Sequence, residues 1–316
     1  MNLSEVVNFQ ANIANLAQSR PHYDSSYEAD TATLWGWFNP PQGETPCFSL
    51  QLLNDIRAHD SALESRNGHV YHNGALSKVN YYVVGSRVPG IFNLGGDLAL
   101  FMMLIKSGER DALAHYSRLC IDNLYPRIRN YNCSTMTTIS LIQGDALGGG
   151  FETALASDVL VAEENAMIGL PEILFNLFPG MGAYSLLSRR VGPRVAEELI
   201  TSGRIHTGAE LHQMGIIDVL AKDGEGEQAV REWIARNQKR RNGFQAVMEA
   251  RRVTNPITRD ELDKITNVWV DAALRLEERD LKMIGRLVRS QSRRIAVGPD
   301  SAPFSPVVAI SEATAA

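Results

Sequence analysis

The stretch that decides the fold is "GDALGGGFETALASD", residues Gly144–Asp158. It follows a β-branched, apolar run, Thr135–Gly144, and it leads into a segment of helical character from about Phe151 to Ser157. Glycine loses more backbone freedom on folding than any other residue, so three glycines in succession are costly. They indicate that something has to approach the backbone closely between a strand and a helix.

The same order of strand, loop and helix recurs upstream. Strands are expected over residues 31–40 and 79–86, and the second of them leads through the turn "NLGGD", Asn93–Asp97, into a helix near Leu98. β-Branched strands that look buried on both faces are typical of parallel sheets with crossover helices. The sequence therefore predicts an α/β fold whose sites lie where strand ends meet helix starts.

Composition and charge exclude several classes of protein. The 316 residues are 44% hydrophobic and 21% charged, which is typical of a globular chain with a sizeable core. The net charge of −5 argues against a dedicated nucleic-acid binder. No apolar run approaches the roughly 18 residues of a membrane span, and the first residues do not resemble a signal peptide. Cys47, Cys120 and Cys133 form no CxxC pair, so we expect reduced thiols, a cytoplasmic location and no metal site.

Four regions are expected along the chain: an N-terminal arm (1–28), a core with the active site (29–223), a helical C-terminal region (224–297) and a flexible tail (298–316). The C-terminal region is basic, and its "NQKRR" cluster with Arg251 and Arg252 is interpreted as a solvated face. That face is also a hypothetical docking site for an acidic carrier protein. "TRDE", Thr258–Glu261, has the pattern of a capping box that opens one long helix with apolar positions as far as Val288.

The glycine-rich turn suggests two kinds of site. A phosphate-binding loop would need Gly-Lys-Ser/Thr, or a third glycine where Thr153 stands, and the carboxylate of Glu152 would repel phosphate. An oxyanion hole fits better, because backbone N–H groups at a helix N-terminus stabilise developing negative charge. Glu152, and Glu172 twenty residues later, are candidates for proton transfer. A glutamate in the first turn of a helix also occurs merely because it stabilises the helix dipole.

The segment from "TTISLIQGDALGGGFETALASD" through "AMIGLPE" to "FPGMGAYSLLSRRVG" strongly resembles the crotonase (enoyl-CoA hydratase/isomerase) superfamily. That family has a G-x-A-L-G-G-G-x-E turn, then A-x-x-G-x-P-E and P-G-x-G. The resemblance extends over about residues 31–220. It implies a ββα spiral core with a helical C-terminal trimerisation region, and assembly as a homotrimer or hexamer.

The resemblance also assigns residues by position. It implies oxyanion donors at the backbone amides of Gly96 and Gly149, and acid/base carboxylates at Glu152 and Glu172. It requires no cofactor and no metal. The residues that it implies for substrate binding are Leu147, Gly148, Leu170, Met181, Trp269 and Leu287.

Departures from ordinary hydratases resemble the diffusible signal factor synthases, a quorum-sensing branch of the superfamily. They are a longer N-terminal segment, the "NLGGD" turn, an insertion over residues 105–132 and the C-terminal helix. This branch implies dehydration of a medium-chain 3-hydroxyacyl group on acyl carrier protein, then hydrolysis to a free cis-2-unsaturated fatty acid. A sensor protein of the same signalling system is a further expected partner; nucleic acid and membrane are not. The alternatives are an enoyl-CoA hydratase or isomerase of fatty acid metabolism, and a crotonase-fold protein that binds and regulates a sensor.

Overall fold

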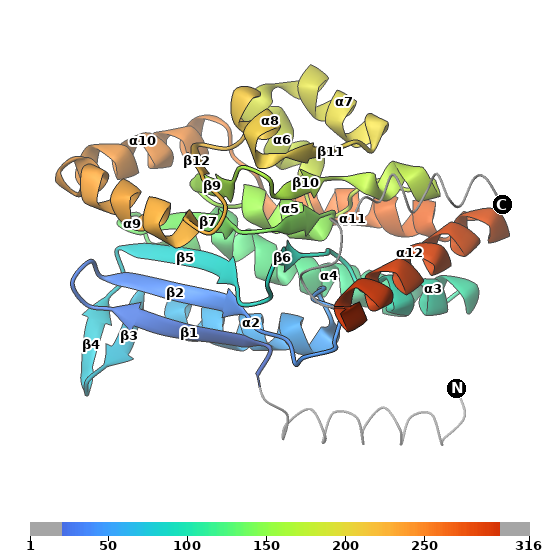
Figure 1. The fold of residues 1–316 in the computed structure, drawn as a ribbon, viewed down its shortest axis with the longest axis horizontal. Coiled ribbons are helices and arrows are strands. Elements are labelled where there is room, and N and C mark those ends of the chain that lie inside the picture. The colour runs from blue at the N-terminus through green and yellow to red at the C-terminus, as the bar shows by residue number, and fades with distance from the viewer. Residues whose placement is uncertain (1–20, 298–316) are drawn as a thin grey trace.

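The computed structural model describes residues 21–297 (Figure 1). The predicted tail (298–316) and the first 20 residues of the predicted arm lie outside this range. The rest of the predicted arm contributes to a sheet, because Tyr23–Glu28 forms strand β1, antiparallel to β2 (Thr33–Phe38). The described chain thus enters the sheet before residue 29.

The main sheet has six strands in the order β1-β2-β5-β7-β9-β12. Apart from β1 and β2, all neighbouring strands are parallel. Strands β2, β5, β7 and β9 are buried along their whole length, which explains their continuous runs of β-branched and aromatic residues. The predicted α/β class is therefore confirmed. The remaining strands of this sheet are β5 (Tyr81–Ser86), β7 (Thr137–Ile142), β9 (Val159–Glu163) and β12 (Val219–Ala221).

A second sheet has four short strands in the order β11-β10-β8-β6. Each of β5, β7 and β9 is followed by one strand of this second sheet and then by a helix, so a ββα unit repeats along the chain. The bounds are β6 (Ile91–Asn93), β8 (Asp145–Leu147), β10 (Met167–Gly169) and β11 (Ile205–Thr207). Because β6 and β8 are parallel neighbours, the glycine-rich turns that follow them lie at the same edge.

The largest hydrophobic core lies between one face of the main sheet and the helices α2, α4 and α5. The opposite face packs against α9 (Gly226–Asn237), where Val230 and Ile234 meet Trp35 and Trp37. The strands β3 (His69–His72) and β4 (Ala75–Lys78) form a separate hairpin.

The helices up to residue 213 are α2 (Leu50–Ser65), α3 (Leu98–Lys106), α4 (Arg110–Ile128), α5 (Gly149–Leu155), α6 (Ala183–Val191), α7 (Pro193–Ser202) and α8 (Gly208–Gln213), with 3₁₀ helices η1 (Asn130–Asn132) and η2 (Pro171–Phe175).

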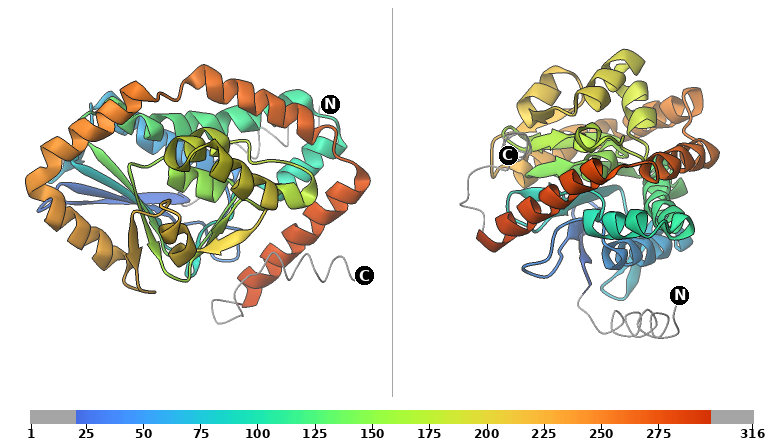
Figure 2. Two further views of the ribbon diagram at one scale, coloured as in Figure 1. Left: turned by 90° about the horizontal axis from the view of Figure 1, so that it is seen from above. Right: turned by 90° about the vertical axis from the view of Figure 1, so that its right-hand side faces the viewer.

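The C-terminal region consists of α9 (Gly226–Asn237), the 3₁₀ helix η3 (Gln238–Arg240), α10 (Arg241–Thr254), α11 (Arg259–Ala273) and α12 (Glu278–Val297). Helix α11 lies beside α4, and α12 folds back across α3 (Figure 2). None of the helices within residues 21–297 is long and apolar enough to cross a membrane.

The prediction of one long helix after Thr258 is wrong. Thr258 caps α11 by accepting a hydrogen bond from the Glu261 amide, but the Glu261 carboxylate does not close the box and instead binds Ser185 and Arg189. Helix α11 ends at Ala273, and α12 begins at Glu278. The side chain of Asp280, in the first turn of α12, accepts a hydrogen bond from the amide of Glu277, which directly precedes the helix. Apolar residues recur on both sides of this break, so their spacing did not predict that the helix is interrupted.

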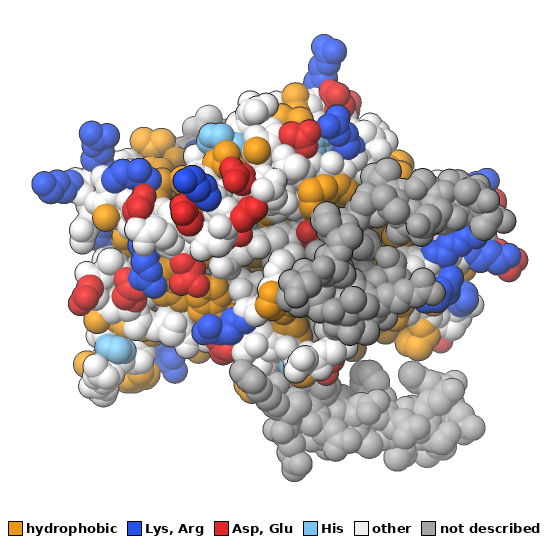
Figure 3. Space-filling model, viewed as in Figure 1, with side chains coloured by type: hydrophobic (Ala, Val, Ile, Leu, Met, Phe, Trp, Pro, Cys, Tyr) orange, Lys and Arg blue, Asp and Glu red, His pale blue; other side chains and the backbone are white. Residues whose placement is uncertain are grey.

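The predicted solvated face is confirmed in part, because Lys239, Arg240 and Arg251 are exposed, but Arg251 and Arg252 also contact the core. Arg252 and Arg251 of α10 bind the carboxylate of Asp158, at 2.9 Å and 3.3 Å, and this residue is only 6% exposed. Asp158 also accepts hydrogen bonds from Asn130 and from the Thr138 amide. The two arginines therefore attach α10 to the core. On the face drawn in Figure 3, basic and acidic side chains are interspersed.

Replacing Asp158 by Ala should lower the free energy of unfolding by about 3 kcal/mol, because two arginines and a buried amide lose their shared acceptor. Urea unfolding measures this loss. The matched control is Asp271→Ala, which removes an exposed ion pair with Arg110 and should change stability by less than about 1 kcal/mol. Equal effects of the two variants would contradict the role given to Asp158.

Candidate active site

The two glycine-rich turns contact each other. A β-carbon on Gly95 would lie 2.7 Å from the carbonyl oxygen of Leu147 and 3.0 Å from the amide nitrogen of Gly149. Gly95 also has a φ of +88°, a backbone conformation that residues with a side chain rarely adopt. The turn after β6 therefore fits against the turn after β8 only because residue 95 has no side chain.

The candidate oxyanion donors are the backbone N–H groups of Gly96 and Gly149. In each case, a hydrogen bond to the carbonyl group of the same peptide fixes the direction of the N–H. The Gly95 carbonyl accepts a hydrogen bond from the Phe48 amide (2.7 Å), and the Gly148 carbonyl accepts one from the Glu152 amide (3.0 Å). In a planar trans peptide, the N–H points opposite to the C=O. The amides of Gly96 and Gly149 are thus directed away from Phe48 and away from the body of α5. Both glycines line the same cavity.

Glu152 lies in the first turn of α5 and is 1% exposed. Its Oε1 accepts a hydrogen bond of 2.8 Å from the Ala183 amide, at the start of α6. Burial raises the pKa of Glu152 to about 7, although the amides of Ala183 and Met181 favour the ionised form. Glu152 therefore exchanges a proton readily near neutral pH.

Glu172 belongs to the 3₁₀ helix η2, directly after Pro171. Its Oε2 atom is shielded from solvent and makes no hydrogen bond within the described residues. Burial, and then the negative charge of Glu152, raise the pKa of Glu172 to about 8. A β-carbon on Gly148 would lie 2.4 Å from its Oε1, so this carboxyl group rests against the second glycine turn.

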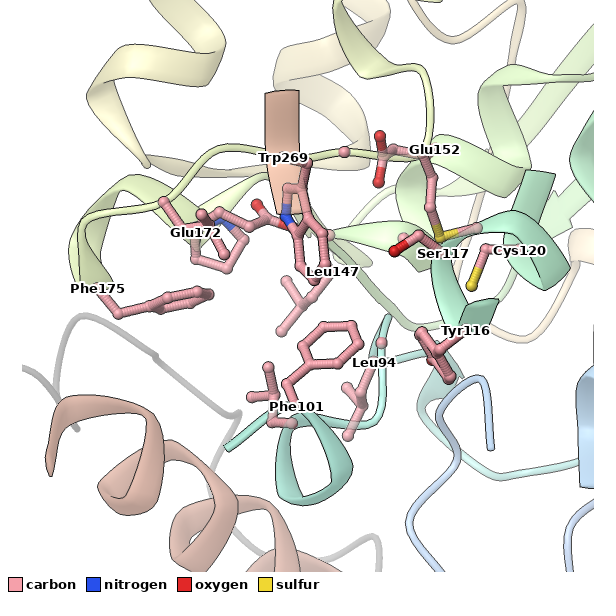
Figure 4. A pocket seen from close by; sticks show the side chains of 18 of the residues that line it. Leu94, Phe101, Tyr116, Ser117, Cys120, Leu147, Glu152, Glu172, Phe175 and Trp269 are labelled. Carbon is pink, nitrogen blue, oxygen red and sulfur yellow. The ribbon is translucent and has the colours of Figure 1, made fainter. Parts of the chain in front are cut away.

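Both carboxyl groups open into one cavity of about 810 Å³ including its open mouth (Figure 4). The glycine turns and the glutamates supply its polar groups. Its other walls are largely apolar and come from α3, α4, η2, α11, α12 and the loops between them; they include Leu94, Leu98, Phe101, Tyr116, Leu147, Phe175, Leu177, Met181, Trp269 and Leu287.

Of the residues predicted for this site, the structure brings all but one to the cavity. Gly96, Gly148 and Gly149 line it, and so do the two glutamates and the predicted apolar residues Leu147, Met181, Trp269 and Leu287. Leu170 is the exception, because it packs in the main hydrophobic core at 1% exposure. It follows Ile168 by two positions on an extended segment, so both side chains point to the same, inner face.

Sequence reasoning missed the wall that α4 provides. Tyr116, Ser117 and Cys120 face the cavity from this helix, and Phe101 faces it from α3 (Figure 4). The spacing of 116, 117 and 120 is helical, but the same spacing serves any buried helix face. Within residues 21–297, no three His, Cys, Asp or Glu side chains come together as a metal site would require.

Comparison with known proteins gives a consistent result. The family model described as "Enoyl-CoA hydratase/isomerase" matches residues 77–262. Methylglutaconyl-CoA hydratase from mouse mitochondria is 36% identical over 157 residues, which are 49% of this chain and 47% of the relative. Cyclohexa-1,5-dienecarbonyl-CoA hydratase from Thauera aromatica is 37% identical over 154 residues, covering 48% of this chain and 58% of the relative. The chain spans about half the length of the curated relatives it matches.

Solved structures share the fold over most of the chain. An enoyl-CoA hydratase from Mycobacterium avium subsp. paratuberculosis has a TM-score of 0.65 at 18% identity, covering 86% of this chain and 97% of that one. DspI from Pseudomonas aeruginosa has a TM-score of 0.58 at 21% identity, covering 80% and 93%. The expected crotonase spiral with C-terminal helices is thereby confirmed.

Because the pKa of Glu172 is raised from 4.5 to about 8, the native state holds this proton more tightly than the unfolded state. The contribution of Glu172 to stability is therefore greatest below pH 4.5 and falls as pH rises toward 8. Replacing Glu172 by Gln should raise the free energy of unfolding at pH 8, by up to roughly 4 kcal/mol, and have little effect at pH 4.5.

Urea unfolding of both proteins at the two pH values measures the difference. Glu249→Gln, on the exposed side of α10, is the control and should show no such pH-dependent gap. A Glu172→Gln variant that is less stable than the wild type at pH 8 would contradict the assignment of an unfavourably buried carboxylate.

Proposed function

Because the chain belongs to the enoyl-CoA hydratase/isomerase family, we propose that it adds water to, or removes water from, an acyl thioester of the 2-enoyl/3-hydroxyacyl type. The observation that carries this proposal is the pairing of two buried carboxyl groups with raised pKa values beside two inward-facing glycine amides in one cavity. Addition of water across the C2–C3 bond needs a base for the water, an acid for C2 and a stabiliser for the enolate oxygen.

The surroundings of the two carboxyl groups suggest their roles. Glu152 accepts hydrogen bonds from the amides of Ala183 and Met181, which favour its ionised form. In hydration it takes a proton from the water that attacks C3. The Oε2 atom of Glu172 has no hydrogen-bond donor within the described residues, and burial and the charge of Glu152 raise its pKa, so Glu172 keeps its proton and gives it to C2. In dehydration the roles reverse: Glu172 takes the C2 proton and Glu152 protonates the departing hydroxyl.

The amides of Gly96 and Gly149 are proposed to bind the thioester oxygen. That oxygen gains negative charge when C2 becomes carbanion-like, and preorganised amide donors in an enclosed site stabilise it without reorganising. Gly149 is also the first residue of α5, so the positive end of the helix dipole acts in the same direction. The apolar walls are proposed to hold the acyl chain.

A second candidate is synthesis of a cis-2-unsaturated fatty acid signal. The observation that favours it is the origin of the cavity walls. Leu287 comes from the C-terminal helix, and Tyr116, Ser117 and Cys120 come from the inserted segment over residues 105–132. These are segments whose sequences resemble the diffusible signal factor synthases. In this proposal the substrate is a 3-hydroxyacyl group on acyl carrier protein, and water then attacks the enoyl thioester so that the thiol leaves. Trimeric or hexameric assembly and a sensor partner are part of the same proposal.

The first experiment follows the absorbance of a trans-2-enoyl-CoA while it is hydrated. The variants Glu152→Gln and Glu172→Gln should each lower kcat by about 100-fold or more, because each removes one proton-transfer group. Glu249→Gln should leave kcat unchanged. Wild-type rates in both active-site variants would refute the assignment of the two glutamates.

The second experiment separates the two candidates. Incubation with 3-hydroxydodecanoyl carrier protein, followed by mass spectrometry, should yield free cis-2-dodecenoic acid if the chain both dehydrates and hydrolyses. Accumulation of the trans-2-enoyl thioester with no free acid would refute the synthase proposal and leave the hydratase proposal standing.

A further inference from the structure

Tyr116 lies at the wall of the cavity, but its hydroxyl group is engaged with the backbone. The hydroxyl donates a hydrogen bond of 2.6 Å to the carbonyl of Phe48 and accepts one of 3.2 Å from the amide of Asp97. The side chain is 2% exposed, and burial raises its pKa well above the usual range, so the hydroxyl stays neutral and keeps its proton to donate.

Phe48 and Gly96 form an isolated parallel β-bridge, and neither residue is part of a named strand. One connection of this bridge is direct, from the Phe48 amide to the Gly95 carbonyl at 2.7 Å. The other connection, between the Asp97 amide and the Phe48 carbonyl, runs through the Tyr116 hydroxyl. A single side chain from α4 thus links both sides of the turn that carries Gly96.

The Gly95–Gly96 peptide is the unit that this arrangement holds. Its carbonyl is fixed by Phe48, and its N–H is the proposed oxyanion donor on the opposite side of the same plane. A displacement of the Phe48 backbone, or of Gly96 through its neighbour Asp97, would change the direction of that N–H. Since amide donors act over a narrow range of distance and angle, a small rotation weakens the hydrogen bond strongly.

We infer that Tyr116 is a positioning residue that holds the Gly96 amide in the oxyanion hole through Phe48 and Asp97. The aromatic ring of Tyr116 has a separate role, because it packs edge-on against Phe101 at 5.0 Å between centroids. Phe101 in turn covers Gly96, where a β-carbon would lie 2.5 Å from the ring. Replacing Tyr116 by Phe keeps this packing and removes only the hydroxyl.

The inference rests on the proposed function, and its test has a readout that needs no turnover. The wild type and Tyr116→Phe are each mixed with an excess of an acyl-CoA that has no double bond in its chain and carries ¹³C at the thioester carbonyl. The carbonyl stretch is recorded by isotope-edited infrared spectroscopy. Hydrogen bonds from the oxyanion hole lower this frequency. We expect the frequency to rise in the variant toward its value in water-free solvent, because one donor is misdirected.

Kinetics of the same proteins supply the second readout. The variant should lose about 10- to 100-fold in kcat with less than a threefold change in KM, since a misplaced donor affects the transition state more than binding. The matched control is Tyr81→Phe: Tyr81 is also 2% exposed, it packs on the opposite face of the main sheet, and its hydroxyl makes no hydrogen bond within the described residues. It should match the wild type in frequency and in kcat.

Each result decides the question. A carbonyl frequency and kcat in Tyr116→Phe equal to those of the wild type would overturn the inference while leaving the proposed function intact. Equal losses in Tyr81→Phe would also overturn it, because the effect would then be one of general packing. If the wild type itself does not bind the acyl thioester, the proposed function fails and the inference fails with it.

Discussion

The site depends on a contact between two backbone turns that has no space for side chains. The turn after β6 and the turn after β8 approach so closely that a β-carbon on Gly95 would collide with the Leu147 carbonyl. On the other side, a β-carbon on Gly148 would collide with the Glu172 carboxyl group. The glycines that destabilise the chain locally therefore bring two amides and one carboxyl group into a single cavity. Parallel pairing of β6 and β8 places the two turns at the same edge of the sheet.

The same enclosure gives the carboxyl groups their chemistry. In water a glutamate is ionised at neutral pH and is a weak base, but burial destabilises the charged form. Here burial shifts the pKa values of Glu152 and Glu172 to about 7 and about 8. The negative charge of Glu152 adds to the effect of burial at Glu172 and favours a protonated Glu172 beside an ionised Glu152. Under the proposed function, two chemically identical side chains thus act as an acid and a base at the same pH.

The sequence was sufficient for features that are local in the chain. The glycine turn after β8, Glu152 and Glu172 lie within 30 residues of one another, so a motif records their arrangement. Features that depend on how distant helices are placed were harder to predict. Nothing near Tyr116 in the chain indicates that α4 brings it to Phe48, 68 residues earlier. Leu170 was misassigned because it directly follows β10 and packs into the main core, whereas Glu172 belongs to the 3₁₀ helix η2, which begins at Pro171 and lines the cavity.

The C-terminal helices are coupled to the chemistry through one short segment. Trp269 of α11 packs on Gly180, where a β-carbon would lie 2.4 Å from the indole ring. The next residues, Met181 and Ala183, provide the amides that bind the carboxylate of Glu152. A shift of α11 would therefore move the hydrogen-bond donors of Glu152 and change the width of the apolar wall together. Because the break at residues 274–277 lets α12 fold back beside the cavity, the region that forms its apolar wall also sets the environment of one carboxyl group. Under the proposed function, acyl-chain recognition and proton transfer are in this way linked by packing instead of by a shared side chain.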